Sequence, residues 1–336
     1  MNGAPDTTDR RPRVLALSGG IGGAKLALGL YRVLPAWELA VVANTGDDFE
    51  HFGLPISPDV DTLMYTLSGE NNQEQGWGRA DETWTFMEQL GRFGGETWFQ
   101  LGDGDLAVHM QRAEAFKRGD TLSTITADLC RRLGVEAHIW PMSDSPVRTL
   151  VDTADGRELP FQRYFVEEAC KPVVSGFRFA GVDAAEPNDS FLALLADPAL
   201  HTVIVCPSNP FVSVDPILAI PGVLDALGAC PAPVIAVSPI VGGDAIKGPA
   251  AKMMREMNQP VSPVSIALHY AGLLDGFILD HADSGLADSL DIPSLVTDTV
   301  MRTLEDREAL ARDVLAFAER ISANEDSSAS TVQRVV

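Results

Sequence analysis

Three features are scarce in this chain: cysteine, basic side chains and long apolar runs. Only four of its 336 residues are cysteines. They are far apart and lack zinc-ligand spacing, so we expect reduced thiols rather than a disulfide framework or a zinc module. Lys and Arg total 25 against 47 Asp and Glu, and this net charge of −22 argues against binding to a nucleic-acid backbone. There is no membrane-length apolar run and no signal peptide, so we expect a cytoplasmic protein without membrane partners.

Glycine, in contrast, is concentrated near the start of the chain. Residues 14–17 predict a short buried parallel strand, and apolar residues from 26 onward have helical spacing. The loop between them holds the candidate phosphate-binding residues Gly19, Gly20, Gly22, Gly23 and Lys25. Its backbone N–H groups, the helix N-terminus and the lysine can all contact an anion. The loop lacks the third glycine of the dinucleotide fingerprint and the Gly-Lys-Ser/Thr of a P-loop. It predicts a phosphate or nucleotide site, with an ordinary glycine-rich turn as the alternative.

Four aspartates follow the next apolar segment. Residues 39–43 predict a second parallel strand, after which the chain turns polar at Asn44. Ligands of doubly wound sheets lie at the carboxyl ends of strands, so we expect this segment and the glycine loop to line one crevice. The aspartates, all within 15 residues, are Asp47, Asp48, Asp59 and Asp61. The last two also fit the first turn of a helix over 58–68, where they would complement the helix dipole. As a set, the four predict a magnesium-bridged phosphate site.

The following hundred residues contain a candidate acid/base pair and most of the tryptophans. Asp105 and His109 are four residues apart, which places them on one face of a helix over 105–117. A carboxylate that orients an imidazole suits proton transfer, and a surface pair without a catalytic role is the alternative. Aromatic residues between 65 and 98, including Trp77, predict either core packing or a wall that stacks on a flat ligand. Residues 68–79 predict a mobile loop that could act as a lid.

The second half of the chain repeats the pattern of a strand followed by a polar turn. Residues 202–206 predict a strand, and Ser208 and Asn209 come directly after it. No Gly-x-Ser-x-Gly pattern surrounds Ser208, so we interpret it as a binding residue rather than a nucleophile. A strand over 233–237 is followed by a glycine turn and Lys247. Turn formation alone, without a ligand, is the alternative for both turns.

These segments predict an α/β protein with a Rossmann-like, doubly wound and mainly parallel sheet. We expect one elaborated domain over residues 13–322, interrupted by a mostly helical insertion at about 58–134 and a small antiparallel β insert at about 146–181. Helices are predicted over 58–68, 80–93, 105–117 and 122–133, with a closing helix over 304–322. The polar ends, residues 1–12 and 323–336, are predicted to be disordered tails.

Several of these motifs occur in an order that resembles one known family. The ordered blocks are residues 18–25 (SGGIGGAK), 44–48 (NTGDD), 56–62 (ISPDVDT), 77–78 (WG), 101–109 (LGDGDLAVH), 141–144 (PMSD), 207–210 (PSNP) and 238–243 (SPIVGG). Together they resemble the 2-phospho-L-lactate transferase family, CofD or FbiA, over residues 13–290. The chain departs from the family pattern at Gly104, where an arginine is expected.

The resemblance implies a transferase of coenzyme F-420 biosynthesis. Members of the family move a phosphorylated three-carbon acid from a guanosine diphosphate-activated donor to the ribityl hydroxyl of the deazaflavin FO, and release GMP. The acid is 2-phospho-L-lactate, phosphoenolpyruvate or 3-phosphoglycerate. These differ by one small group, so the sequence does not name the donor. The resemblance further implies Mg²⁺ as cofactor and a homodimer.

The resemblance also assigns roles to the candidate residues. The catalytic set is Asp61, Asp48 and His109. Donor phosphates and guanosine are assigned to Gly19, Gly20, Gly22, Gly23, Lys25, Asn44, Ser208 and Asn209. FO is assigned to Asp61, Trp77, Asp103 and Asp105, and the metal to Asp48, Asp59 and Asp61.

Two other functions are compatible with the glycine loop. A nucleotide-sensing regulator is one, because regulatory proteins of the gluconeogenesis-factor type share the loop and an Asn-Thr-x-Asp-Asp block. The blocks around Trp77 and His109 favour the transferase, and FO binding would separate the two. A Rossmann dehydrogenase is the other, but the chain lacks the third glycine and the acidic residue at the end of the second strand.

Overall fold

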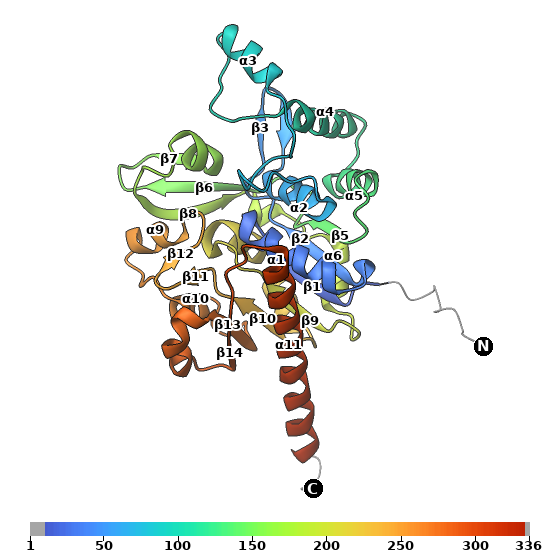
Figure 1. Cartoon of the computed structure of the whole chain (residues 1–336), viewed down its shortest axis with the longest axis vertical. Coiled ribbons are helices and arrows are strands. Elements are labelled where there is room, and N and C mark those ends of the chain that lie inside the picture. The colour runs from blue at the N-terminus through green and yellow to red at the C-terminus, as the bar shows by residue number, and fades with distance from the viewer. Residues whose placement is uncertain (1–10, 333–336) are drawn as a thin grey trace, which may run out of the picture.

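A seven-stranded parallel sheet forms the centre of the molecule (Figure 1). The computed structural model describes residues 11–332, and side chains as far as residue 324. The sheet has the order β14-β13-β10-β9-β1-β2-β5. Its strands are β1 (Val14–Ser18), β2 (Leu39–Ala43), β5 (His138–Pro141), β9 (Thr202–Val205), β10 (Val234–Val237), β13 (Gly276–Asp280) and β14 (Ser294–Thr297). The predicted Rossmann-like parallel sheet is confirmed.

The central strands are apolar along their whole length because both faces of the sheet are covered. In β1, Val14 and Ala16 pack into one core, while Leu15 and Leu17 pack into the other. Five helices contribute to the first core: α1 (Gly20–Val33), α2 (Pro58–Ser68), α4 (Asp103–Lys117), α5 (Leu122–Arg132) and α11 (Leu304–Val332). Five helices contribute to the second: α6 (Asp189–Leu195), α7 (Asp215–Leu218), α8 (Val223–Gly228), α9 (Ala250–Glu256) and α10 (Pro263–His269).

The insertion between β2 and β5 contains the predicted helices and one hairpin that the sequence did not predict. Beside α2 and α5 it holds α3 (Thr85–Arg92) and α4 (Asp103–Lys117), so the helix predicted over 80–93 starts later. The hairpin is β3 (Phe49–His51) paired with β4 (Leu54–Ile56). Its turn places Phe52 at φ 53° and Gly53 at φ 74°. Phenylalanine rarely adopts this left-handed conformation, so no pattern in the sequence indicated a turn here and the hairpin was not predicted.

The predicted antiparallel insert is present as a separate three-stranded sheet of order β7-β6-β8. Its strands are β6 (Arg148–Thr153), β7 (Glu158–Pro160) and β8 (Val174–Ala180). Gly156 supplies the positive φ of 82° in the first turn. A short hairpin of β11 (Ile240–Val241) and β12 (Asp244–Ala245) precedes α9.

The two ends of the chain differ from the prediction. Residues 1–10 lie outside the described part, and Arg11 donates a hydrogen bond of 3.1 Å to Asp197. Helix α11 does not end at 322 but continues to Val332 (Figure 1), so the predicted disorder of residues 323–332 is wrong. That segment contains neither glycine nor proline, so nothing in its sequence stops the helix. Within residues 11–332, every helix is too short or too polar to span a bilayer.

The strand order creates a crevice beside β1. The chain leaves β1 toward β2 and β5 on one side, and returns to β9 on the other, so the order reverses between β1 and β9. Loops that follow these two strands separate there, and doubly wound sheets bind ligands at this point. The glycine loop follows β1, and the turn with Ser208 follows β9.

Candidate functional site

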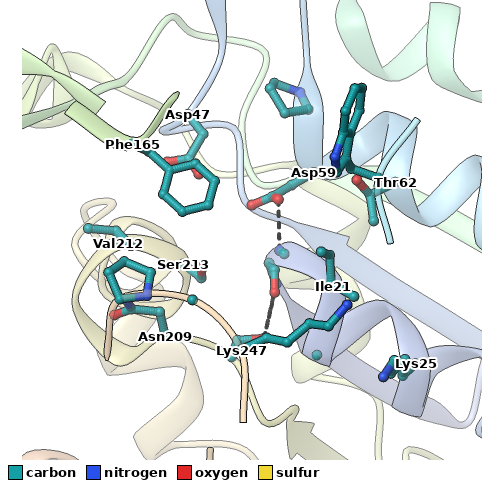
Figure 2. Close-up of a pocket in the computed structure, with 18 of the residues that line it drawn as sticks. Ile21, Lys25, Asp47, Asp59, Thr62, Phe165, Asn209, Val212, Ser213 and Lys247 are labelled. Atoms are coloured by element: carbon teal, nitrogen blue, oxygen red, sulfur yellow. Dashed lines mark hydrogen bonds between the residues drawn. The ribbon is translucent and has the colours of Figure 1, made fainter. Parts of the chain in front are cut away.

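A cavity of about 630 Å³ lies at this crevice, a size typical of small-molecule sites (Figure 2). Its walls come from the loop after β1, the first turns of α1 and α2, the turn after β9, and residues 246–250 and 299–301. Residues 75–78 of the predicted lid and the aromatic residues 98–99 complete it. Of the segment after β2 that the sequence placed at the same crevice, Asp47 lines this cavity.

The glycine loop is joined to the turn after β9 by one serine. The Gly19 N–H donates to Ser208 Oγ at 3.2 Å, and that hydroxyl donates to the Gly19 carbonyl at 2.8 Å. A Cβ on Gly22 would lie 2.4 Å from the Pro207 carbonyl oxygen, and one on Gly23 would lie 2.6 Å from Ser208 Oγ. Ser208 therefore holds the two loops together, a role that the sequence did not suggest. The close packing explains why the loop is made of glycine.

The first turn of α1 points toward the cavity and already holds one carboxylate. Asp59 Oδ1 accepts from the Gly20 N–H at 2.7 Å, and its Oδ2 accepts from Asn44 Nδ2 at 2.9 Å (Figure 2). The Gly20 N–H is thus already hydrogen-bonded within the protein. Ile21 and Gly22 belong to the same turn and line the cavity. Their position at a helix N-terminus suits a phosphate group. Gly23 lies behind this turn, against Ser208.

The four predicted aspartates are all buried, but they face different partners. Asp47 lines the cavity and its Oδ1 has no hydrogen-bond partner. Asp48 accepts from Ser57 Oγ at 2.8 Å and is not part of the cavity wall. Burial raises the pKa of Asp48 to about 7 and that of Asp59 to about 6. Burial, together with the charge of Asp59, raises the pKa of Asp47 well above its ordinary value.

This arrangement changes the expected magnesium ligands. Among residues 11–324, no group of three or more His, Cys, Asp or Glu side chains is placed to hold a metal ion by itself. Mg²⁺ commonly takes one or two carboxylates and completes its shell with phosphates and water. Asp47, with its unpartnered oxygen, and Asp59 face the cavity together and fit that role. Asp48 lies outside the cavity wall, and Asp61 is engaged by another partner.

The partner of Asp61 is Arg112, a fully buried residue of α4 that the sequence analysis did not single out. Both carboxylate oxygens of Asp61 accept from the guanidinium, one of them at 3.1 Å from Nη1. The same Nη1 lies 3.1 Å from Nδ1 of His109. A guanidinium only donates, so Nδ1 is the acceptor and the ring proton is on Nε2. Arg112 follows His109 by three residues on the predicted helix face, which is the one sequence signal that could have revealed it.

The predicted pair of Asp105 and His109 continues this buried chain. Nε2 of His109 lies 3.2 Å from Asp105 Oδ2, although it is not aligned for a hydrogen bond. Asp105 Oδ1 accepts from the Tyr65 hydroxyl at 2.6 Å. His109 is 1% exposed and both of its ring nitrogens face other protein groups, although its edge contributes to the cavity wall. It is therefore placed to support Asp61 through Arg112.

Aromatic side chains from several segments also line the cavity. The aromatic wall consists of Tyr65, Trp77, Trp98, Phe99, Phe161 and Phe165. Trp77 is 43% exposed and packs edge-on to Trp84 at 6.2 Å between centroids. Asp103, expected to contact FO, lies outside the cavity. Its carboxylate accepts from the N–H groups of Thr85 and Phe86 at the start of α3.

The remaining predicted donor residues also lie at the cavity. Asn209 lines it and accepts from the Phe211 N–H at 3.0 Å. Lys25 Nζ donates to the Met301 carbonyl at 2.9 Å and occupies the far side of the cavity in Figure 2. Lys247, from the segment before α9, projects between Lys25 and the glycine loop. Burial and the charge of Lys247 lower the pKa of Lys25.

The raised carboxylate pKa values predict a stability that falls as the pH rises. Asp48 binds its proton more tightly in the folded protein than in the unfolded chain, where its pKa is near 3.8. Its contribution to stability is therefore fully present below about pH 4 and is lost as the pH rises through about 7. We expect the melting temperature of Asp48→Asn to fall less than that of the unsubstituted protein between about pH 4 and pH 8. Circular dichroism melts over this range measure it, with the exposed Asp189→Asn as control. Equal slopes would contradict the burial argument.

Comparisons with known proteins agree with the motif resemblance. The family model of 2-phospho-L-lactate transferase CofD matches residues 14–318. A phosphoenolpyruvate transferase of Kitasatospora aureofaciens is 38% identical over 318 residues, covering 92% of this chain and 98% of the relative. One of Thermobifida fusca is 41% identical over 286 residues, covering 81% and 87%.

A solved structure supports the fold alone. Protein BH3568 of Bacillus halodurans, described as a member of the UPF0052 family, superposes with a TM-score of 0.61 at 14% identity, covering 91% of this chain and 99% of that one. The family match and the relatives at 36–41% identity extend over nearly the whole chain. The protein is therefore a member of the 2-phospho-L-lactate transferase (CofD) family of transferases.

Proposed function

We propose that this protein transfers a phosphorylated three-carbon acid from a guanosine diphosphate-activated donor to the ribityl hydroxyl of FO, with release of GMP. The relatives above are named phosphoenolpyruvate transferases, which favours the phosphoenolpyruvyl donor over the phospholactyl and phosphoglyceryl ones. Magnesium dependence, a homodimer and a role in coenzyme F-420 biosynthesis in the cytoplasm belong to the same proposal.

One observation carries the proposal: a single cavity is lined both by a helix turn suited to phosphate and by aromatic side chains. The first turn of α1 and the cations Lys25 and Lys247 suit a diphosphate. The aromatic wall suits a flat tricyclic ring, because aromatic faces stack on it with little loss of side-chain entropy. Asp61 lies on the cavity wall between α1 and α4. A dehydrogenase would not need a carboxylate there.

In the proposed reaction, the ribityl hydroxyl attacks the phosphorus that carries the three-carbon acid. A new phosphorus–oxygen bond to FO forms, and the bond to the GMP oxygen breaks. We assign Asp61 to accept the hydroxyl proton, because it reaches the cavity and Arg112 fixes its orientation. The N–H groups of Ile21 and Gly22 bind the phosphate oxygens as charge shifts to the leaving group. A magnesium ion held by Asp47 and Asp59 would neutralise part of that charge.

The test is a transfer assay with each donor separately. Purified protein is incubated with FO, Mg²⁺ and one of the three guanosine diphosphate donors, and deazaflavin products are separated by mass. We expect a product with the phosphoenolpyruvyl donor, formed together with one equivalent of GMP. Asp61→Asn is the matched control, and it should form no product while it melts cooperatively. No product with any donor, and no change of FO fluorescence on titration, would overturn the proposal in favour of a nucleotide-binding regulator.

A further inference from the structure

A second, smaller cavity adjoins the first beside α1 and α2. Its volume is about 100 Å³, roughly that of three water molecules in the liquid, so it holds a single small group. The two cavities share Ile21, Lys25, Thr62, Lys247 and residues 77–78. A ligand bound in the main cavity can therefore extend one end into this side cavity.

Four cations converge on the side cavity, and we call them the basic cluster: Lys25, Lys247, Arg302 and Arg307. They come from α1, the segment before α9, and the start of α11, so only the fold brings them together. This grouping is unusual in a chain with a net charge of −22. Burial lowers the pKa of Lys25, and the positive charges of Lys247 and Arg307 lower it further.

The cluster lacks carboxylate partners. Among residues 11–324, no Asp or Glu forms an ion pair with any of the four, whereas the neighbouring Arg312 pairs with Glu308 at 2.7 Å. Arg307 is only 8% exposed and its Nε has no hydrogen-bond partner. Within the described residues, Lys25 donates one hydrogen bond, to the Met301 carbonyl. The charge of Asp306 acts on Arg307 without a direct ion pair, so four neighbouring cations remain that a bound anion would stabilise.

We propose that the side cavity is an oxyanion subsite that binds the carboxylate of the donor's three-carbon acid. This inference rests on the proposed function. The carboxylate is the terminal group of that donor, whereas both phosphates are internal, and a cavity for one small group admits a terminal group. The hydroxyls of Thr62 and Thr66 and the amides of Asn71 and Gln73 supply further donors. The last two belong to the predicted lid, so the acid would contact it directly.

The experiment compares ligands that possess and lack the acid. Binding of the phosphoenolpyruvyl donor and of GDP is measured by calorimetry without FO, so no turnover is needed. We expect Arg307→Gln, which changes a residue of the side cavity alone, to weaken donor binding at least about 10-fold, the loss of one charge-assisted hydrogen bond, and to leave GDP binding within about 2-fold. Arg312→Gln, on the exposed side of α11, is the matched control and should change neither.

Each other outcome contradicts the inference. Parallel weakening of GDP would show that the cluster holds a nucleotide phosphate, and unchanged donor binding would show that it holds nothing from the donor. A second measurement does not depend on the donor or on folding yield. Arg307→Met should melt at a higher temperature than the unsubstituted protein, since it removes one of four neighbouring positive charges, and inorganic phosphate should raise its melting temperature less. Failure of transfer with intact donor binding would contradict the proposed function alone.

Discussion

Replacing Arg112 by methionine is expected to lower the free energy of unfolding by about 3–5 kcal/mol, because it leaves the Asp61 carboxylate buried without its partner. The same change removes the group that orients Asp61, so we expect transfer activity to fall by at least about 100-fold. Urea denaturation and the rate of product formation measure the two effects. Arg118→Met is the matched control on α4. Arg118 is 62% exposed and its pair with Asp120 should contribute less than about 1 kcal/mol.

A double substitution separates pairing from simple packing. If Arg112 mainly compensates the charge of Asp61, Asp61→Asn should recover a large part of the stability lost in Arg112→Met. Activity should stay lost, because the assigned proton acceptor is then absent. A loss below about 1 kcal/mol in Arg112→Met, or a double variant no more stable than the single one, would contradict the role assigned to this pair.

Gly22→Ala is expected to reduce kcat/KM by about 100-fold with a small effect on the melting temperature. The added Cβ would lie 2.4 Å from the Pro207 carbonyl oxygen, a backbone atom that cannot rotate away. The glycine loop and the turn after β9 must then separate, which displaces the phosphate-binding turn of α1 from the cavity. A displacement of about 1 Å at a reacting group can account for a loss of this size.

The control for this prediction is Gly228→Ala, near the end of α8. No atom lies within 4 Å of a Cβ at that position, so activity should stay unchanged. Steady-state kinetics with varied donor and saturating FO would measure both variants. Unchanged kcat/KM in Gly22→Ala would show that reaction of the donor does not depend on the contact between the glycine loop and the turn after β9.

The sequence predicted the sheet well because its strands are buried on both faces and carry unbroken apolar runs. Residues 39–43 were assigned correctly from that signal alone. The prediction from sequence failed where local signals were weak or absent. The hairpin turn was missed because Phe52 has a backbone conformation that is rare for phenylalanine. The end of α11 was placed too early, although no glycine or proline follows residue 322 to stop the helix. Both are local errors that leave the topology unchanged.

The site was predicted less completely, since motifs reveal which residue types are near the ligand but not which partners they meet. Asp48, Asp59 and Asp61 were predicted at the metal, and the sequence did not indicate that Asp61 pairs with Arg112 or that Asp47 has an unpartnered oxygen. Ser208 was predicted to bind the ligand, and it lines the cavity while it also joins two loops. The basic cluster combines residues 25 and 307, a contact that no local pattern encodes.

The most direct test of this account is a crystal structure of the protein with GDP and FO bound. The account predicts the diphosphate in the main cavity against the first turn of α1, at the N–H groups of Ile21 and Gly22. It also predicts the deazaflavin ring on the aromatic wall, with its ribityl hydroxyl directed toward Asp61 and the side cavity left free of phosphate. A diphosphate bound away from α1, or FO outside the main cavity, would contradict the assignment of this crevice as the transfer site.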